Sequence, residues 1–378
     1  MDLHIRFFLE GENQQYGRVI LMREGDDSLP HLTSGVFMFV VHFSNWGPKI
    51  SGLYESVKNQ IKYERREGLR SECAISYEKE PAEKVDDWLV PITWEEAKKA
   101  DIWVLHTNIP GELKEDKKKN KTVAVLHGPT EHMLFAEWGK TSDSFNLHIN
   151  ILWEMDATVC INTHEYDIMK LYDEKVGRCR YIPNSIDLEE MKIDAVWQYD
   201  HHPAIISCDT PRVEKLPFHI IWAMPYVEEK IPGARLNLFS LLLEPISMWR
   251  NAFCRAHKRK LENLCENIQL ANKNLKPFQA GADIGFNNNY SGIASRVTME
   301  MMAYGVPVVS YNGEYTKYHA KPFDLHSIAE QMERCWNDLK APGSTLREDT
   351  LRYAKENFHR ERWVKDYVAL YNELLSKK

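Results

Sequence analysis

One carboxylate stands out because of the residues that surround it. Glu300 lies in the stretch SRVTMEMMAYGVPVVSY (295–311), among methionines and shortly before Gly305 and Pro307. We predict a helix over 292–304, since glycine commonly follows the last turn of a helix and proline prevents continuation. A carboxylate on this helix can accept hydrogen bonds from sugar hydroxyl groups, and such charge-assisted bonds are roughly twice as strong as neutral ones.

The beginning of this predicted helix has a composition that suits an anion. It follows the small, polar stretch NNNYSG. The free backbone N–H groups and the positive end of the helix dipole favour a phosphate there. The segment therefore combines a diphosphate site at its start with a hydroxyl acceptor two turns later. An ordinary core helix with an ion pair between Glu300 and Arg296, four residues earlier, also explains the pattern, and both interpretations stay open at this point.

Alternating apolar strands and helices must position this segment. Continuous apolar runs are typical of strands that are buried on both faces. Strands are predicted at 35–43, 100–108, 121–130, 156–165, 203–210, 234–243, 282–288 and 306–311. Helices are predicted at 53–68, 165–175, 214–233, 248–273 and 292–304, and from about 346 onward. This alternation indicates parallel α/β sheets, and Pro183 and Asn184 mark a connector between two of them.

Composition limits the class of protein. The chain has 378 residues, which suits about two domains, and a formal net charge of −7, which argues against a nucleic-acid-binding class. Seven cysteines without a CxxC pair predict reduced thiols in a cytoplasmic protein rather than a disulfide framework or a zinc site. Two basic clusters, 114–121 and 255–260, are either solvated faces or points of peripheral contact with a membrane or nucleic acid.

Five motifs in order resemble one enzyme family. TMEMMAYGVPVVS is similar to the signature xEAMAxGxPVVA of the retaining glycosyltransferases of family 4, which have the GT-B fold. YIPNSID resembles the family's connector IPNGID, and VAVLHG resembles the end of a strand in its first domain. GFNNNYSGIAS stands in the place of vxPSxxEGFGL, and the C-terminal helices resemble the family's closing helices. The resemblance implies two Rossmann-like α/β domains that face each other across a cleft.

Strand-like runs near the N-terminus and, from about residue 35 onward, the resemblance predict a domain organisation. The chain is expected to begin with a β extension over 1–34, followed by an acceptor domain over 35–182. A nucleotide-sugar donor domain is expected over 183–357, with the last helix, 358–378, packing back on the first domain.

The resemblance assigns positions in the donor site to four residues near the predicted helix and to one residue at the end of a strand. Glu300 matches the carboxylate that binds the donor ribose, and Ala294 and Ser295 match positions whose backbone amides approach the diphosphate. His127 matches a histidine that contacts the donor sugar near the reacting centre, although a structural role is the alternative. Gly292 stands where the family has a second glutamate, so the donor sugar is held differently, or activity is weak or lost.

Loops after two strands complete the implied donor site. Arg212 and Lys215 follow a predicted strand and match the cations that bind the donor phosphates, although Arg212 is displaced from the usual spacing. Fixed cations there stabilise the charge that develops on the leaving diphosphate. Gly47 and Gly52 stand in the loop after the first strand, where close backbone approach is needed, although the family's paired glycines are absent. Solvated charges and ordinary turns are the alternatives.

The resemblance implies a metal-independent retaining hexosyltransferase. Its co-substrate would be a UDP- or GDP-linked sugar, with no further cofactor and no metal, and its acceptor a glycan, a lipid or another hydroxyl compound. Three alternatives share the architecture: a catalytically silent protein that binds sugar nucleotides or glycans, a phage-type glucosyltransferase that modifies DNA, and a non-transferring epimerase.

Overall fold

The computed structural model describes residues 38–44, 52–76, 89–106, 113, 116, 119–127, 154–173, 177–208, 217–241, 265–270, 275–289, 294–311 and 313–377. Every element below belongs to one compact unit, Met38–Lys378. The predicted N-terminal extension over 1–34 lies outside the described residues.

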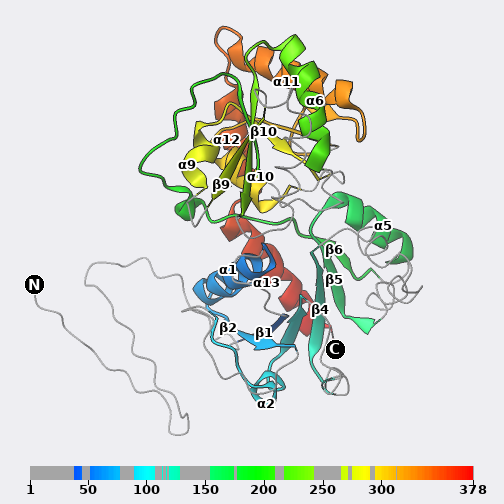
Figure 1. Cartoon of the computed structure of the whole chain (residues 1–378). Helices are drawn as coiled ribbons and strands as arrows, with labels where there is room; N and C mark the ends of the chain where they lie inside the picture. The colour runs from blue at the N-terminus through cyan, green and yellow to red at the C-terminus, as the bar shows by residue number, and fades with distance from the viewer. Residues whose placement is uncertain are drawn as a thin grey trace, which may run out of the picture. The chain divides into compact units, whose positions relative to one another are not determined.

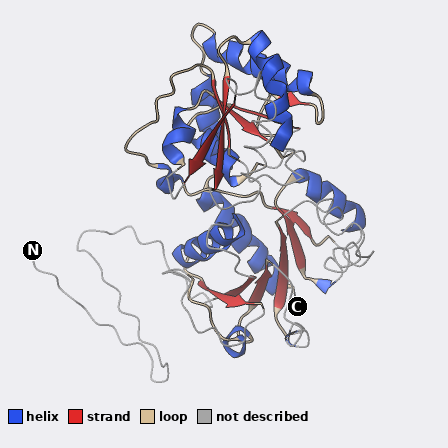
Figure 2. Ribbon diagram, in the orientation of Figure 1, coloured by secondary structure: helices blue, strands red, loops and turns tan. Residues whose placement is uncertain are grey.

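The first sheet has six parallel strands in the order β2-β1-β3-β4-β5-β6 (Figures 1 and 2). Its strands are β1 (Phe39–Ser44), β2 (Arg70–Ile75), β3 (Ile102–Leu105), β4 (Lys121–Leu126), β5 (Ala157–Cys160) and β6 (Cys179–Tyr181). The helices between them are α1 (Gly52–Arg66), α2 (Trp94–Ala97) and α5 (Thr163–Asp173). The order reverses between β1 and β3, and in open parallel sheets this switch point is where ligands bind.

The second sheet also has six parallel strands, in the order β12-β11-β10-β7-β8-β9. Its strands are β7 (Ala204–Ser207), β8 (Arg235–Leu241), β9 (Cys265–Leu270), β10 (Ile284–Asn287), β11 (Val308–Tyr311) and β12 (His319–Ala320). The 3₁₀ helix η3 (Leu188–Met191) precedes it, and its helices are α6 (Pro217–Lys230), α9 (Lys276–Gly281), α10 (Arg296–Ala303), α11 (Leu325–Lys340) and α12 (Leu346–Asn357). The last described helix, α13 (Arg360–Ser376), packs on the first sheet. Its switch point lies between β7 and β10.

Strand alternation divides the core of the first sheet into two faces. Odd-numbered residues of β1 such as Val41 and Phe43 join Trp103 in one apolar cluster, whereas Val40 joins Val104 in another. Successive side chains of a strand point to opposite faces, so the parity of the residue number decides the face. The even-numbered face of β1 and β3 is covered by α13, which lies beside α1 (Figure 1).

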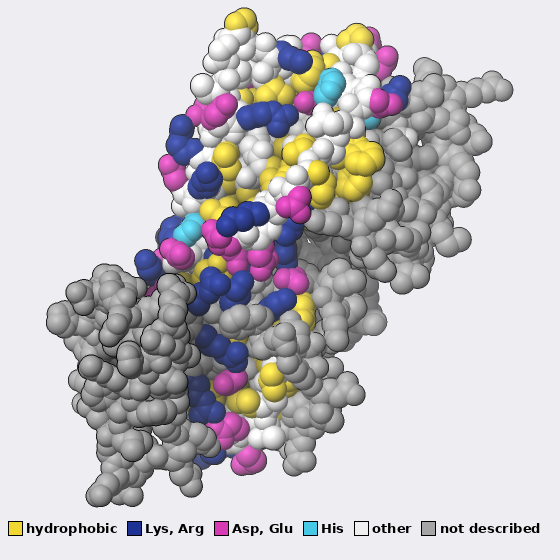
Figure 3. All heavy atoms as spheres, turned by 90° about the vertical axis from the view of Figure 1, so that its left-hand side faces the viewer, with side chains coloured by type: hydrophobic (Ala, Val, Ile, Leu, Met, Phe, Trp, Pro, Cys, Tyr) yellow, Lys and Arg dark blue, Asp and Glu magenta, His cyan; other side chains and the backbone are white. Residues whose placement is uncertain are grey.

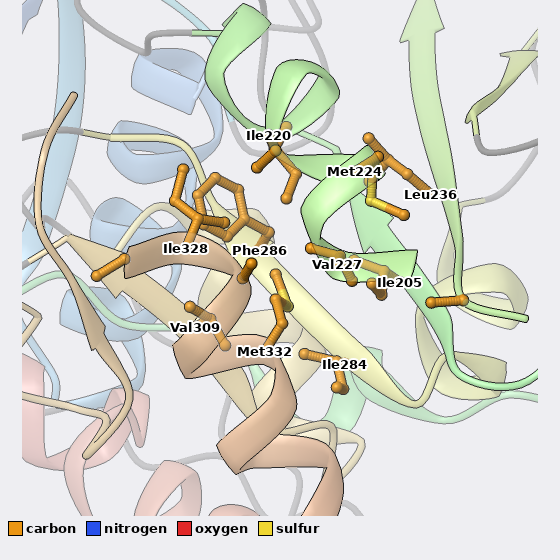
Figure 4. Close-up of a cluster of buried hydrophobic side chains, with 14 of the residues drawn as sticks. Ile205, Ile220, Met224, Val227, Leu236, Ile284, Phe286, Val309, Ile328 and Met332 are labelled. Carbon is orange, nitrogen blue, oxygen red and sulfur yellow. The ribbon is translucent and has the colours of Figure 1, made fainter. Parts of the chain in front are cut away.

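Helices cover both faces of the second sheet. One cluster unites α6 and α11 with the strands, and Figure 4 shows Phe286 surrounded by aliphatic side chains such as Ile328 and Met332. The opposite face packs against α9, α10 and α12 through residues such as Phe278 and Met299. The sheet is therefore the central layer of three, and α10 is fixed to it by apolar contacts. No helix within the described ranges combines the length and apolar character that crossing a bilayer requires.

Three predictions about elements need correction. Residues 265–270, predicted as part of a helix over 248–273, form β9 instead. β9 is the edge strand of the described sheet and pairs with β8, and an edge strand does not require the continuous apolar pattern of a central one. The helix predicted over 292–304 begins at Arg296, after the cap residue Ser295. The connector near Pro183 also contains regular elements, β6 before it and η3 after it.

Gly305 ends α10 in a conformation that other residues adopt at a cost. Its φ is +76°, and a Cβ there would lie 2.9 Å from the carbonyl oxygen of Arg347. Gly343 has a similar φ of +73°, with nothing within 4 Å of the corresponding Cβ position. Gly343→Ala should therefore cost only the left-handed strain, about 1 kcal/mol, whereas Gly305→Ala should cost about 1–3 kcal/mol more because backbone must move.

Urea unfolding of both variants measures this difference. Equal losses of unfolding free energy would show that the neighbouring backbone of Arg347 yields without cost.

Candidate functional site

Polar side chains connect the strands at the switch point of the second sheet. Asn288, which follows β10, donates a hydrogen bond of 2.6 Å from Nδ2 to Oγ of Ser207, the last residue of β7. Asn287 donates to the hydroxyl of Tyr315, and Ser310 lies 2.8 Å from the same hydroxyl oxygen. These buried amides and hydroxyls fix the carboxyl ends of neighbouring strands, the edge at which a ligand would bind.

α10 follows this strand edge and carries Glu300. The side chain of Ser295 caps the helix by accepting a hydrogen bond of 3.2 Å from the N–H of Thr298. The last turn ends in Gly305, and Pro307 precedes β11. Short helices with a polar cap and a glycine stop are stabilised chiefly by packing, and the buried methionines of α10 supply it.

Glu300 is nearly buried and has a fixed partner on each carboxylate oxygen. Its Oε1 accepts a hydrogen bond of 2.8 Å from Nε of Arg296, and its Oε2 accepts one of 3.1 Å from Nε2 of Gln279 on α9. Burial, together with the charge of Glu300, raises the pKa of the adjacent Tyr304 hydroxyl. The predicted ion pair with Arg296 is confirmed. A carboxylate oxygen has two lone pairs, so each oxygen retains acceptor capacity for a ligand hydroxyl.

Arg296 joins α10 to α1. One terminal nitrogen lies 2.9 Å from Oε2 of Glu55, while Nε is held by Glu300. Burial by itself lowers the pKa of this guanidinium, but the charges of Glu300 and Glu55 outweigh burial and leave it raised. On α1, Lys62 also lies 2.9 Å from Oδ2 of Asp187, the residue of the connector that caps η3. Charged contacts therefore fix α1 against both α10 and the connector.

His127 stands directly after β4 and belongs to a row of three histidines. Its Nε2 lies 2.7 Å from Nδ1 of His106, and Nε2 of His106 lies 3.0 Å from Nδ1 of His42. Nε2 of His42 lies 2.8 Å from Oε2 of Glu64 on α1. Burial lowers the pKa of His127 to about 4, so its imidazole is neutral at physiological pH.

The predicted site residues have different outcomes. Ser295, Ala294 and Glu300 lie on or beside α10, and His127 lies at the end of β4. Gly52 is the first residue of α1 rather than part of the preceding loop. Four predicted residues lie outside the described residues, namely Gly47, Arg212, Lys215 and Gly292. The roles given to all of these residues remain predictions.

The structure adds residues that sequence reasoning missed. His42, His106 and Glu64 extend the environment of His127, and Gln279 holds Glu300. One signal was present in the sequence: each histidine stands two residues after a valine of a predicted strand, at Val40, Val104 and Val125. Residues two apart along a strand point to the same face, and the three valines belong to one apolar cluster, so the three imidazoles lie on the same face of the sheet. The glutamate and the glutamine lie on helices far away in the sequence, and no pattern indicates them.

Solved structures with this arrangement are glycosyltransferases. Neither a protein-family model nor a curated protein matches the sequence. Sucrose-phosphate synthase from Thermosynechococcus elongatus matches with a TM-score of 0.70 and 13% identity, over 90% of this chain and 100% of that one. HepE from Anabaena, solved with UDP-glucose, matches with a TM-score of 0.68 and 13% identity, over 90% of this chain and 100% of that one. The fold is GT-B.

A third structure agrees with this assignment. A glycosyltransferase from Rickettsia africae matches the chain with a TM-score of 0.65 and 12% identity, over 90% of this chain and 99% of that one. The prediction of a GT-B fold with two Rossmann-like sheets is therefore confirmed. Within GT-B, the histidine row occupies the switch point of the first sheet, and the Ser207–Asn288 pair occupies that of the second.

Proposed function

We propose that this chain is a retaining glycosyltransferase of family 4. It transfers a sugar from a nucleoside diphosphate sugar, linked to UDP or GDP, to a hydroxyl of a glycan, a lipid or another acceptor. The observation that carries the proposal is the position of Glu300. It is a buried carboxylate, fixed by two donors, on the helix that follows the switch-point strand β10 of a GT-B second sheet.

Glu300 accepts hydrogen bonds from the ribose hydroxyls of the donor. Arg296 and Gln279 hold its two oxygens in place, so little conformational entropy is lost when a ligand binds. The amides near Ala294 and Ser295 approach the diphosphate, together with Arg212 and Lys215. The support is that the capped start of α10 stands beside the strand edge where GT-B ligands are expected, and that HepE was solved with UDP-glucose.

The proposed chemistry rests on positioning and electrostatics. The acceptor hydroxyl attacks the anomeric carbon on the face from which the diphosphate leaves, and a leaving phosphate oxygen takes its proton. Fixed cations and helix amides stabilise the leaving charge without a metal ion. His127, neutral and partly exposed at the end of β4, contacts the donor sugar.

A thermal shift panel of nucleotide sugars tests the proposal. A donor at 100 times its Kd should stabilise the fold by about 2.7 kcal/mol, because binding to the native state alone shifts the unfolding equilibrium. We expect one UDP- or GDP-linked sugar to raise the melting temperature, and slow release of free sugar from it. A panel in which no nucleotide sugar changes the melting temperature would refute the donor assignment.

Gly292 supports an alternative function for the same fold. It replaces the family's second glutamate, which supports a catalytically silent protein that binds a sugar nucleotide or glycan. The same panel separates the two functions: stabilisation without turnover of any donor would indicate the silent protein. Release of an inverted sugar without an acceptor would indicate an epimerase.

Surface charge bears on the remaining alternative, a DNA-modifying glucosyltransferase. On the face shown in Figure 3, Lys and Arg side chains are interspersed with Asp and Glu side chains among the described residues. A DNA-binding surface carries a continuous basic stripe, which this face does not support. Of the two basic clusters, 255–260 lies outside the described residues.

We place the enzyme in the cytoplasm, since the six described cysteines form no disulfide with one another.

A further inference from the structure

Four side chains form a continuous row of hydrogen bonds that the proposed transfer does not explain. The row begins at His127, which is partly exposed, and passes through His106 and His42 to the fully buried Glu64. The two ring contacts join adjacent strands, and the rings of His42 and His106 are stacked with centroids 5.3 Å apart. Three imidazoles at this spacing, on one sheet face and ending on a carboxylate, have the composition of a proton pathway.

The surroundings of Glu64 show that it can remain ionised. Its Oε2 accepts bonds from His42 and, at 2.6 Å, from the hydroxyl of Ser71 on β2. Its Oε1 accepts bonds of 2.8 Å from the hydroxyl of Tyr371 on α13 and 3.1 Å from Nε2 of Gln60. Four donors match the roughly four acceptor sites of a carboxylate. A buried anion needs such partners, and here each oxygen has two.

An ionised Glu64 determines the direction of every bond in the row. Nε2 of His42 must donate to the carboxylate, and in a neutral imidazole this leaves Nδ1 of His42 as an acceptor for the Nε2–H of His106. Nδ1 of His106 then accepts from the Nε2–H of His127. Nδ1 of His127 is left with a lone pair, and no partner for it is found among the described residues.

The geometry points to a proton relay in which Glu64, His42 and His106 fix the tautomer of His127 and receive the charge of a proton taken up at its Nδ1. This inference rests on the proposed function, because it assigns the substrate-facing end of the relay to the donor and acceptor site. Glu64, His42 and His106 are positioning residues, since each acts through His127.

One proton passes through the relay without any change of oxidation state. An O–H bond of a substrate hydroxyl breaks, and an N–H bond forms at Nδ1 of His127. The Nε2 proton of His127 moves to Nδ1 of His106, and the Nε2 proton of His106 moves to Nδ1 of His42. His127 and His106 remain neutral with exchanged tautomers, while His42 becomes an imidazolium beside the carboxylate of Glu64. The reverse sequence then passes the proton from Nδ1 of His127 to a leaving phosphate oxygen, which is the final proton acceptor of the proposed transfer.

The groups around the histidine row favour placing the positive charge on His42, beside Glu64, rather than on His106. Burial, followed by the charges of its two histidine neighbours, holds the pKa of His106 well below its ordinary value. Burial by itself raises the pKa of Glu64, but His42 and the hydrogen bonds from Ser71 and Tyr371 outweigh burial and lower it. Among the described residues, Tyr367 and Tyr371 of α13 also face Glu64, and their raised pKa values keep both hydroxyls protonated.

A metal site is the other use of clustered histidines. In this row the ring nitrogens face one another at 2.7 and 3.0 Å, so each lone pair is already directed at a neighbouring N–H. A metal ion needs nitrogens directed at a shared point about 2.0–2.1 Å away. No group of three or more His, Cys, Asp or Glu residues in the described part of the chain could hold one.

Histidine ¹⁵N NMR of the intact wild-type chain, without ligand, tests the relay. At about pH 8.5 we expect the three imidazoles to be neutral with the proton on Nε2. Lowering the pH should switch all three with a single shared midpoint: His42 becomes charged, and His127 and His106 change to the Nδ1–H tautomer while neutral. Independent titrations, or a His127 that charges while His42 stays neutral, would overturn the inference. This result does not depend on whether the chain transfers a sugar.

Two glutamate variants give the functional readout. Glu64→Gln should abolish the concerted tautomer switch, lower kcat for UDP-glucose turnover about 100-fold and change its pH profile, with KM changed less than about threefold. The control is Glu72→Gln, the same change on β2 in a residue whose carboxylate lies 2.7 Å from Arg65 at the surface. It should leave the NMR behaviour and kcat unchanged. Retention of the concerted switch in Glu64→Gln would overturn the relay. If wild-type protein turns over no UDP- or GDP-linked sugar of the panel, the transferase proposal fails, and the NMR result still decides the relay.

Discussion

Replacing Glu300 with glutamine should weaken binding of UDP by about 10- to 100-fold. The carboxamide keeps the size of the side chain and an oxygen that can accept from Arg296, and its NH2 group can donate to Gln279 once the Gln279 amide turns to present its oxygen. It removes the charge that strengthens bonds from the ribose hydroxyls, and hydrogen bonds to charged groups contribute about 1.5–3 kcal/mol. Isothermal titration calorimetry with UDP measures the effect without need of an acceptor.

Glu55→Gln is the matched control for this experiment. Glu55 is the other carboxylate that binds Arg296, and the substitution changes charge and size in the same way. We expect the affinity for UDP to change by less than about threefold, because surface ion pairs contribute roughly 0–1 kcal/mol. Equal losses in both variants would mean that Glu300 acts only by holding Arg296. An unchanged affinity in Glu300→Gln would remove the ribose role altogether.

Replacing Phe286 with alanine should lower the free energy of unfolding by about 3–5 kcal/mol. Phe286 is fully buried at the centre of the cluster in Figure 4, and its ring meets that of Tyr311 edge-on with centroids 5.5 Å apart. Removing the ring loses the transfer free energy of its apolar atoms and leaves a cavity between the sheet and its covering helices. Urea unfolding followed by circular dichroism measures the loss.

Phe323→Ala provides the same chemical change without burial. Phe323 is 70% exposed, so its variant should stay within about 0.5 kcal/mol of wild type. A loss in Phe286→Ala no larger than that in Phe323→Ala would show that the second sheet rearranges to fill the space.

The sequence was informative where strands are buried on both faces. The segments 121–130 and 203–210 contain β4 and β7, because the short apolar runs within them, VAVL and AII, show no polar alternation, as is typical of a strand between two helical layers. The order of elements and the end of α10 at Gly305 followed from local chemistry as well. Glu300 could be placed next to Arg296, since residues four apart share a helix face.

The remaining features depend on contacts between distant segments. Residues 265–270 of β9 were predicted as part of a helix because an edge strand of the described sheet does not need a continuous apolar pattern. Gln279 meets Glu300 only because α9 and α10 pack together, and Glu64 meets His42 only through the fold. The start of α10 was misplaced because both Gly292 and Ser295 suit a helix start, and the cap bond to Thr298 decides between them.

α13 has a consequence for how the chain is made. Its aromatic residues Trp363, Tyr367 and Tyr371 complete the apolar cluster that contains the early strand residues Val40 and Val104. A ribosome synthesises the whole second sheet between these two parts of one core. During synthesis, the apolar face of β1 to β5 that α13 covers therefore stays exposed to chaperones and to aggregation until α13 leaves the exit tunnel. The second sheet, whose strands and covering helices are closer together in the sequence, can mature earlier.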